Sequence, residues 1–330
     1  MFHGVVHEII LKLMLFSLIK IYTYKIKIIF MKFIVTGGAG FIGSHLTRFL
    51  VNNDHDVIVI DNLCRGSMNN LQDIKNKIDF KQLDISDYDK IQNITQNIDG
   101  IFHQAALGSV PQSFKEPKEY HKVNAIGTEN ILKLAKNLHC KVVYASSSSV
   151  YGNQTKFPIK EDAKKNPLNP YGQAKLAAEK FAELYAKDGV KVIGLRYFNV
   201  FGMGQNPDYA GVIHKFIEKL KHQQSPIIEG DGNQIRNFTF IDDVVDANWK
   251  AFESDVDHAF INIANGKTTS IAELATLMIN ISGFSVEPKF VEMRLGDIKK
   301  SHADTNLAHT LIDWIPKNSL EEGLKKIFPN

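Results

Sequence analysis

The sequence contains too few cysteines for a fold built on disulfides or on metal ligands. Cys64 and Cys140 are the only two in 330 residues, and neither they nor the twelve histidines have the spacing of metal ligands. We therefore predict no disulfide scaffold and no metal site. The composition, 44% hydrophobic and 23% charged, is ordinary for a folded globular protein and excludes a disordered or fibrous chain.

Charge of one sign is also scarce over most of the chain. The net charge of +3 is accounted for by residues 1–30, where Lys12, Lys20, Lys25 and Lys27 outnumber Glu8. The rest of the chain is therefore neutral overall. Since proteins that bind DNA or RNA carry a basic patch or stripe, we predict no nucleic-acid partner.

Long apolar runs are absent from the first thirty residues. The longest uncharged apolar run, Leu13–Ile19, has seven residues, whereas a membrane span needs about 20. No small-residue cleavage site of a secretory signal follows it. Two interpretations stay open: residues 1–30 are upstream sequence before a true start at Met31, or they form an amphipathic anchor. We expect the first, and with it a cytoplasmic protein without a membrane partner.

From Met31 onward, short β-branched runs alternate with segments of helical length. The expected strands are Phe33–Val35, Val57–Ile60, Asp79–Leu83, Ile101–His103, Lys141–Ala145 and Val192–Leu195. The expected helices include Phe41–Asn52, Tyr88–Gln96, Glu119–Leu138 and Tyr171–Asp188. Nearly continuous apolar strands that alternate with helices predict an α/β fold with a doubly wound parallel sheet. We expect residues 31–199, with later returns near 236–264, to form a dinucleotide-binding domain, and 200–330 to form mainly a smaller substrate-binding lobe.

A glycine-rich segment follows the first expected strand. Its glycines fit Gly38-x-Gly40-x-x-Gly43 and also a pattern that begins at Gly37. Between a strand and a helix, such a loop allows the helix N-terminus to bind a pyrophosphate. The second strand ends at Asp61, where a carboxylate binds the ribose hydroxyls of adenosine and repels a 2′-phosphate. The pattern predicts NAD rather than NADP; the alternative is a plain glycine turn with a surface aspartate.

A second motif places a phenol and an ammonium on one helix face. Tyr171 and Lys175 have i, i+4 spacing, and a nearby cation lowers the pKa of a phenol. Because ten tyrosines and 34 lysines would produce about one such pair by chance, its placement carries the argument. Asn169-Pro170 is a typical helix start, and the preceding strand ends in four serines. We therefore expect Tyr171 to accept a proton from a substrate alcohol.

These motifs together resemble the extended short-chain dehydrogenases/reductases, in the NAD-dependent epimerase/dehydratase family, and in particular nucleotide-sugar 4-epimerases specific for UDP-glucose and UDP-N-acetylglucosamine. The resemblance covers nearly all of residues 31–330 and implies a Rossmann-type fold. It rests on Asp84-Ile85, His103-Gln104-Ala105-Ala106, the Ser147/Tyr171/Lys175 triad and Leu195-Arg196-Tyr197-Phe198-Asn199. The stretch from His103 to Ser113 is closest to epimerases that accept UDP-N-acetylhexosamines.

The resemblance also implies roles for individual residues. The catalytic residues would be Ser147, Tyr171 and Lys175. The residues around NAD would be Gly37, Gly40, Phe41, Ile42, Gly43, Asp61, Asn62, Asp84, Ile85, Gln104, Ala105, Ala106, Asn124, Tyr171, Lys175 and Tyr197. Asp84 and Ile85 would flank the adenine, Asn124 would help to fix the active-site helices and a bound water, and Lys175 would hold the nicotinamide ribose.

The implied substrate contacts are Ser109, Ser147, Asn199, Arg236, Arg294 and Ser301. Arg236 and Arg294 have an independent argument, because the chain uses 34 lysines but five arginines. The retained arginines then mark sites where a planar, bidentate fork is needed, as for a diphosphate; the alternative is a structural salt bridge. Similar proteins carry Asp after the first arginine, where this chain has Asn237.

The reaction follows from which groups accompany the triad. Relatives that eliminate water or lose carbon dioxide carry a carboxylate directly after the catalytic Ser/Thr, where this chain has Ser148 and Ser149. We therefore expect C4 of a UDP-hexose to be oxidised transiently by bound NAD and reduced again from the opposite face. The alternatives are a 4,6-dehydratase or reductase of the same fold, or a non-catalytic NAD(H)-binding protein. The resemblance also implies a homodimer formed through residues 119–138 and 171–188.

Overall fold

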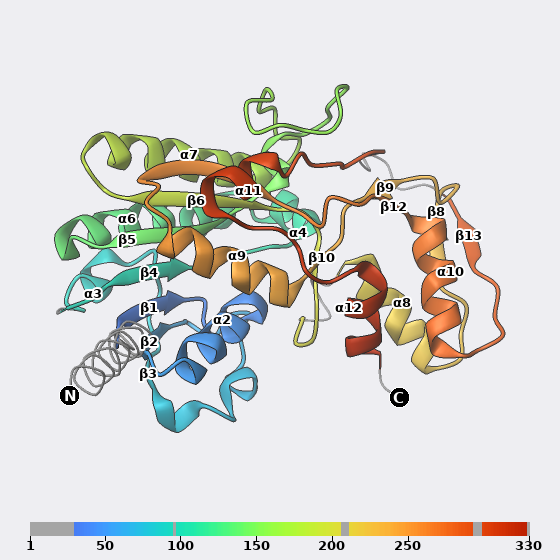
Figure 1. Cartoon of the computed structure of the whole chain (residues 1–330), viewed down its shortest axis with the longest axis horizontal. Coiled ribbons are helices and arrows are strands. Elements are labelled where there is room, and N and C mark those ends of the chain that lie inside the picture. The colour runs from blue at the N-terminus through green and yellow to red at the C-terminus, as the bar shows by residue number, and fades with distance from the viewer. Residues whose placement is uncertain (1–29, 95–96, 206–210, 293–298, 329–330) are drawn as a thin grey trace, which may run out of the picture. The chain divides into compact units, whose positions relative to one another are not determined.

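The computed structural model describes residues 30–328 except 95–96, 206–210 and 293–298. The chain divides into two units, Met1–Met31 and Lys32–Asn330. All structural statements below concern the second unit (Figure 1). The interpretation of residues 1–30 falls almost entirely outside the described residues.

A seven-stranded sheet forms the centre of this unit, with the order β11-β6-β5-β4-β1-β2-β3. Every strand pair in it is parallel. The strands are β1 Lys32–Thr36, β2 Asp56–Ile60, β3 Ile78–Lys81, β4 Gly100–His103, β5 Lys141–Ser147, β6 Val192–Tyr197 and β11 His258–Ile263. This topology confirms the predicted doubly wound α/β fold. Strand order reverses between β1 and β4, the point where such sheets bind ligands.

Both faces of the sheet are covered by helices, because its strands are apolar on both sides. Ile34 of β1 packs on the side of α6 (Gly127–Leu138) and α7 (Pro170–Lys187). Its neighbour Phe33 points to the opposite face, where its ring meets Phe252 of α9 (Ile241–Glu253) edge-on. The helix α2 (Phe41–Asn52) also covers this second face, beside α9. These two layers fix the strand ends that form the site.

Two of the predicted helices differ from the structure. The segment expected as one helix over 119–138 consists of α5 (Pro117–His121), a π-helical stretch at Lys122–Ile126, and α6. The π-helical stretch carries Asn124, whose buried side chain bonds to the backbone of Leu107. A local widening of a helix is frequent where a side chain must reach a functional segment. The helix expected over 88–96 is the short α3 (Tyr88–Ile91), and residues 95–96 lie outside the described residues.

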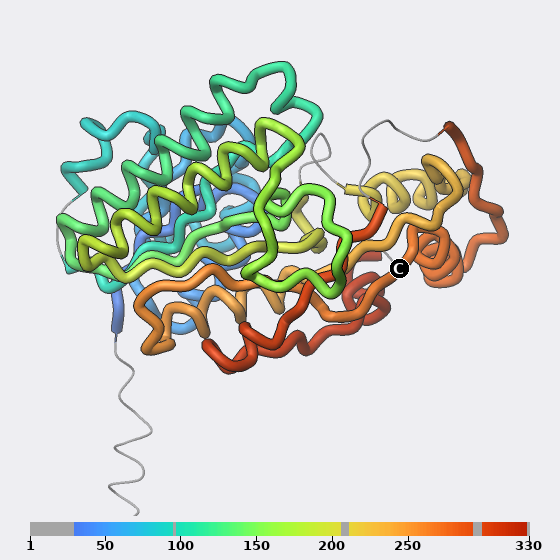
Figure 2. The backbone as a smooth tube through the Cα atoms, turned by 90° about the horizontal axis from the view of Figure 1, so that it is seen from above, coloured from blue at the N-terminus to red at the C-terminus, as the bar shows by residue number. Residues whose placement is uncertain are grey.

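Residues after the sixth strand contribute to both parts of the unit. A smaller lobe contains α8 (Val212–Lys221) and α10 (Ile271–Ser282), which lie side by side (Figures 1 and 2). Its short strand pairs are β8 (Ile227–Glu229) with β13 (Lys289–Val291), and β9 (Ile235–Arg236) with β12 (Thr269–Ser270). The other α-helices and strands of the described residues are α4 (Val110–Lys115), β7 (Val200–Phe201), β10 (Thr239–Phe240), α11 (Asn306–Ile312) and α12 (Leu320–Ile327).

The predicted division at residue 199 stays a prediction, since α9 and β11 come from beyond it and belong to the sheet and its covering layer. Within the described residues, no helix is long and apolar enough to cross a bilayer.

Candidate active site

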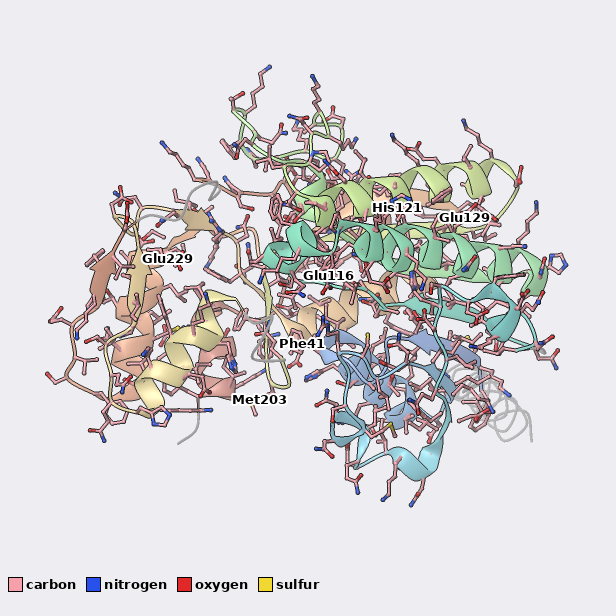
Figure 3. The ribbon with its side chains drawn as sticks, turned by 180° about the vertical axis from the view of Figure 1, so that it is seen from behind. Phe41, Glu116, His121, Glu129, Met203 and Glu229 are labelled. Atoms are coloured by element: carbon pink, nitrogen blue, oxygen red, sulfur yellow. The ribbon has the colours of Figure 1, made fainter. Side chains whose placement is uncertain are left out.

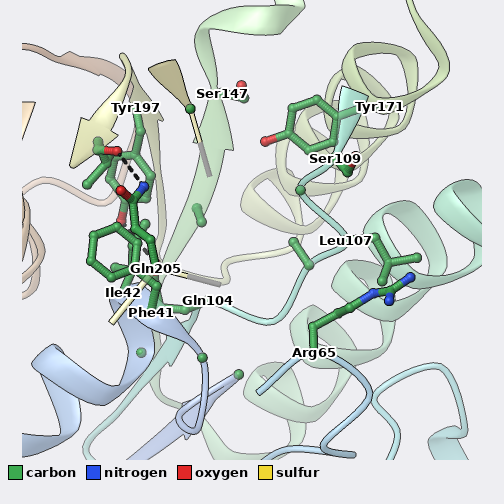
Figure 4. A pocket seen from close by; sticks show the side chains of 18 of the residues that line it. Phe41, Ile42, Arg65, Gln104, Leu107, Ser109, Ser147, Tyr171, Tyr197 and Gln205 are labelled. Carbon is green, nitrogen blue, oxygen red and sulfur yellow. Dashed lines mark hydrogen bonds between the residues drawn. The ribbon is translucent and has the colours of Figure 1, made fainter. Parts of the chain in front are cut away.

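A cavity of about 1090 Å³ lies at the carboxyl ends of the central strands. It is lined by loops that follow β1, β2, β4 and β5 and by residues of the smaller lobe (Figure 4). Phe41 of α2 and Glu229 of β8 contribute to it from the two parts of the unit (Figure 3). The predicted site residues that line this cavity are Gly37, Gly40, Phe41, Ile42, Gly43, Asp61, Asn62, Asp84, Ile85, Gln104, Ala105, Ala106, Ser109, Ser147, Tyr171, Lys175, Tyr197, Asn199 and Arg236.

The backbone around the glycine loop is packed so closely that side chains at Gly37 and Gly43 would clash with it. A Cβ on Gly43 would lie 2.1 Å from the carbonyl oxygen of Gly37, and a Cβ on Gly37 would lie 2.6 Å from the backbone of Ala105. Gly37 also has a φ of +66°, which favours glycine. Gly40 is the N-cap of α2, and no side chain caps that helix end. The loop and the open helix N-terminus therefore fit a dinucleotide pyrophosphate.

Asp61 follows β2 directly, as predicted, and its carboxylate is held by two backbone amides. Oδ2 accepts a hydrogen bond from Ala39 N at 3.0 Å, and Oδ1 accepts one from Leu63 N at 2.8 Å. Burial raises the pKa of Asp61, while these two bonds act to lower it. Each carboxylate oxygen has more than one lone pair, so the group can still accept bonds from ribose hydroxyls. This arrangement fits NAD.

The expected adenine contacts follow β2 and β3. Asn62 donates from Nδ2 to Asp84 Oδ2 at 3.3 Å, and Ser86 donates to Asp84 Oδ1 through both its amide and its hydroxyl. Burial acts to raise the pKa of Asp84, but the bonds from Ser86 and Asn62 leave it below its usual value. Ile85 lies beside this carboxylate and lines the cavity. The pair of loops thus offers a fixed acceptor and an apolar surface for a planar base.

The floor of the cavity contains a hydrogen-bonded side-chain triangle. Gln104 donates to Asn248 Oδ1 at 3.0 Å and accepts from the Tyr197 hydroxyl at 3.2 Å, and Asn248 Nδ2 donates to that hydroxyl at 2.8 Å. Burial raises the pKa of Tyr197, so its phenol stays protonated. Gln104 and Tyr197 were predicted around the cofactor, whereas Asn248 of α9 was missed because it is 51 residues away from Tyr197.

Ser147, Tyr171 and Lys175 meet at the end of β5. Ser147 is the last residue of that strand, and Tyr171 lies in the first turn of α7. The helix begins as predicted: Asn169 Oδ1 accepts a bond from Gly172 N at 2.8 Å, and Pro170 occupies the first position. Lys175 is buried and donates from Nζ to Ala145 O at 2.7 Å. The Ser147 side chain acts to lower the pKa of the Tyr171 phenol.

The expected effect of Lys175 on Tyr171 is wrong for this structure. Burial raises the pKa of Tyr171 above its usual value, and the bond from Ser147 only partly opposes this. The ammonium of Lys175 donates to a backbone carbonyl, and burial lowers the pKa of Lys175 itself to about 8. Desolvation therefore sets the direction of the Tyr171 pKa shift, and sequence spacing does not reveal the extent of burial.

Two of the predicted residues, Asn124 and Ser301, do not line the described part of the cavity. Asn124 is fully buried, and both of its amide atoms bind the backbone of Leu107, so it supports the wall of the cavity. Ser301 is half-buried, and its amide donates to Ile235 O at 2.9 Å, next to Arg236. Arg294 lies outside the described residues.

The segment around Arg236 is tightly fixed. Asn199 donates from Nδ2 to Asn237 O at 2.8 Å. Asn237, the residue where similar proteins carry Asp, uses both ends of its amide: it donates to Lys267 O at 2.5 Å and accepts from Ala303 N at 2.8 Å. A carboxylate could not make the first of these bonds, so the departure is accommodated locally. Ser109 caps α4 by accepting from Gln112 N at 3.3 Å.

Much of the lining has no sequence motif that would identify it. These residues come together only through the fold, and among the described ones they include Asn69, Asn70, Val123, Phe201, Gln205, Ile213, Lys215, Glu229, Gln234, Phe238 and Ile271.

Comparisons with known proteins agree with this geometry. A putative UDP-glucose 4-epimerase of Methanocaldococcus jannaschii is 40% identical over 299 residues, which cover 89% of this chain and 96% of that protein. The UDP-glucose 4-epimerase of Thermotoga maritima, solved with UDP-glucose, is 37% identical with a TM-score of 0.86, covering 90% of this chain and 97% of that one. The UDP-N-acetylglucosamine 4-epimerase of Methanobrevibacter ruminantium, solved with UDP-N-acetylmuramic acid, is 36% identical with a TM-score of 0.86, covering 91% and 97%.

A more distant match is a UDP-glucuronic acid decarboxylase of Xenopus tropicalis, 32% identical over 89% of this chain and 70% of that protein. A sequence model described as the NAD dependent epimerase/dehydratase family matches residues 33–264. The predicted family and cofactor are thereby confirmed: the chain belongs to the NAD-dependent epimerase/dehydratase family.

Proposed function

We propose that this enzyme is a UDP-sugar 4-epimerase that inverts C4 of UDP-hexoses, with UDP-GlcNAc/UDP-GalNAc and UDP-Glc/UDP-Gal among its substrates. The observation that carries the proposal is the meeting of Ser147, Tyr171 and Lys175 at the wall of the cavity that the glycine loop also lines. A proton acceptor is thus placed within one cavity beside a dinucleotide site. The epimerases found among its relatives support the same reaction.

Each residue of the triad has a distinct task in this reaction. When bound, NAD supplies a reversible hydride acceptor for the sugar's C4 carbon and a positive charge that lowers the pKa of a neighbouring phenol. Tyr171 takes the proton of the C4 hydroxyl and gives it back after the sugar has turned over. Ser147 acts to lower the pKa of Tyr171 and is proposed to orient the C4 hydroxyl by a hydrogen bond. Lys175, fixed by Ala145 O, binds the nicotinamide ribose.

The lining favours inversion over elimination or decarboxylation. Those reactions need a further acid or base beside the oxidised sugar, and the residues after Ser147 are Ser148 and Ser149, which both line the cavity. The acidic residues in the described lining are Asp61, Asp84 and Glu229. The first two lie at the expected adenosine end, and Glu229 ends β8 in the smaller lobe. A 4-keto sugar bound at the end of β5 is therefore expected to be reduced again.

The residues proposed to bind the substrate's diphosphate lie in the smaller lobe and in the loop after β6. Arg236 lines the cavity and donates from Nη1 to Ile235 O at 2.9 Å, and a planar guanidinium is suited to phosphate oxygens. Asn199 and Ser109 reach the same cavity from two other elements. Arg294 is proposed as the second diphosphate arginine. Ser301 is proposed to leave room for an N-acetyl group at C2, because the segment carrying it is bonded to Ile235, directly before Arg236.

A homodimer and a cytoplasmic location complete the proposal. The helices α6 and α7 pack together, and α7 exposes 57% of Leu184 while the adjoining α4 exposes 62% of Phe114. If these side chains belong to one contiguous apolar patch, that patch would mark an association surface. Sedimentation of the purified protein at micromolar concentration should give twice the chain mass.

The function is tested with purified protein and four sugar nucleotides. Incubation with UDP-GlcNAc, UDP-GalNAc, UDP-Glc or UDP-Gal, followed by NMR of the products, should show each sugar converting to its C4 epimer without added NAD consumption. A dehydrated or decarboxylated product, or stoichiometric release of NADH absorbing near 340 nm, would instead identify a dehydratase, decarboxylase or dehydrogenase.

A further inference from the structure

A buried ion pair lies behind the triad, and none of the steps above uses it. Glu179 of α7 and Arg196 of β6 expose 3% and 1% of their side chains. Arg196 Nε donates to Glu179 Oε1, and Arg196 Nη2 donates to Oε2, each at 2.8 Å. A buried pair contributes little to stability, since apolar residues of similar volume often serve as well. Its position, one helical turn after Lys175, points to another role.

Both members of the pair are held in place by further bonds. The Ser146 hydroxyl donates to Glu179 Oε1 at 2.6 Å. Arg196 Nη1 donates to the Tyr151 hydroxyl at 2.8 Å and to Glu161 O at 2.9 Å. Burial alone would lower the pKa of Arg196, but the bonds and charge of Glu179 raise it, so the guanidinium stays charged. The carboxylate is therefore fixed in one orientation next to the strand end that carries Ser147.

The charge that acts on Lys175 comes from this carboxylate. Burial lowers the pKa of Lys175 to about 8, and Glu179 acts in the opposite direction. From β4, His103 faces the same ammonium, but burial first and Lys175 second lower its pKa to about 3, so that imidazole is neutral. Tyr171, on the same helix, is a protonated phenol at neutral pH. Among the described residues, Glu179 is thus the charge that opposes the effect of burial on Lys175.

Two further phenols pack around the pair and carry no charge. Burial raises the pKa of Tyr144 on β5 well above its usual value, and burial also raises the pKa of Tyr151. Neither can replace Glu179 as an anion near Lys175.

We propose that Glu179, oriented by Arg196 and Ser146, is a positioning residue that keeps the Lys175 ammonium charged at the end of β5. The carboxylate lies at the i+4 position from Lys175, where side chains of a helix are neighbours. Arg196 holds that carboxylate in place, and its positive charge partly offsets the effect of the carboxylate on Lys175. The proposal rests on the proposed function only where it gives Lys175 a role in turnover. The charge of Lys175 itself can be measured without any reaction.

Removing the charge of Glu179 and removing the charge of Arg196 should shift the pKa of Lys175 in opposite directions. Glu179→Gln keeps the shape and the bond from Ser146 but leaves Arg196 as the nearby charge, so the pKa of Lys175 should fall by about 1 unit or more. Arg196→Met removes the cation and should raise the pKa of Lys175. In the double variant, Glu179→Gln with Arg196→Met, both charges are absent and the pKa should lie between those of the single variants. Glu183→Gln, an exposed position one turn further along α7, is the matched control and should change nothing.

The titration is followed by NMR of protein labelled with ¹³C at the lysine side chains, with Lys175→Met identifying the Lys175 signal. An unchanged Lys175 pKa in folded Glu179→Gln, or a shift of equal size in Glu183→Gln, would overturn the proposal. Should Glu179→Gln not fold, because Arg196 is then an unpaired buried charge, the double variant against Arg196→Met tests the same carboxylate. Equal pKa values of Lys175 in those two proteins would also overturn it.

Kinetics separate this proposal from the proposed function. The alkaline limb of the kcat/KM profile should move to lower pH in Glu179→Gln by the same amount as the Lys175 titration. A wild-type protein without epimerase activity would contradict the proposed function and leave the NMR result standing. The positioning role alone would be contradicted if the wild-type protein is active but Glu179→Gln changes neither the alkaline limb of its kcat/KM profile nor the pKa of Lys175.

Discussion

Substitution of Gly43 by alanine should weaken NAD binding through a backbone clash. The added Cβ would lie 2.1 Å from Gly37 O, 2.7 Å from Gly37 C and 2.8 Å from Gly38 Cα. Backbone atoms cannot rotate away as a flexible side chain can, so the loop must separate from α2. Overpacking of this kind costs roughly 1–3 kcal/mol. At about 1.4 kcal/mol per factor of ten, the affinity for NAD should fall by about 5- to 150-fold.

Two neighbouring glycines turn this prediction into a graded series. A Cβ on Gly40 would lie 3.1 Å from Gly37 O, which a small adjustment relieves, so Gly40→Ala should weaken NAD binding by less than Gly43→Ala. A Cβ on Gly108, which lines the same cavity, meets nothing within 4 Å. Gly108→Ala is therefore the matched control and should bind NAD like the wild type.

The series is measured by calorimetric titration of NAD into protein from which bound nucleotide has been removed. Circular dichroism and thermal unfolding establish that each variant is folded. Wild-type affinity in Gly43→Ala, or an equal loss in Gly108→Ala, would refute the reasoning that the closeness of this loop creates the dinucleotide site.

Further predictions concern the base, the cofactor, the substrate and stability. Tyr171→Phe should keep NAD binding and lower turnover by about 10² or more; near-normal activity in a product assay would contradict the role of Tyr171. Asp61→Ala should weaken NAD binding and relax discrimination against NADP, and unchanged calorimetric affinities for both would exclude the ribose contact. Ser301→Tyr should reduce turnover of N-acetylhexosamine substrates selectively. An equal loss with UDP-Glc would show that Ser301 does not determine whether an N-acetyl group is accepted. Burial lowers the pKa of Lys141 to about 8, against about 10.4 unfolded. The unfolded chain therefore binds more protons between these values, and wild-type stability should rise with pH there relative to Lys141→Met; parallel denaturation curves across that range would contradict this.

The parts of the fold and site that sequence predicts are those with local causes. The glycine loop needs a short series of residues between one strand and one helix, and α7 begins at Asn169-Pro170 because an amide acceptor and a fixed φ favour a helix start. Apolar runs buried on both faces identify the strands, as at β5 and β6, where every residue is buried.

The remaining features depend on contacts between distant residues. Asn248 joins Gln104 across 144 positions, and the edge strand β11 pairs with β6 only once the sheet has formed. The π-helical stretch at Asn124 reflects the need to reach Leu107, which no helical periodicity encodes. The pKa of Tyr171 was predicted with the wrong sign because spacing reports a neighbouring cation but not the extent of burial.

The most direct test of the proposed reaction uses a sugar nucleotide labelled with deuterium at C4. If C4 is oxidised and reduced within one closed site, UDP-galactose formed from [4-²H]UDP-glucose should retain deuterium at C4, and no free NADH should accumulate. Retention is measured by mass spectrometry and by the missing C4 proton signal in NMR. Loss of the label to solvent, or its appearance in released cofactor, would contradict 4-epimerisation by transient oxidation.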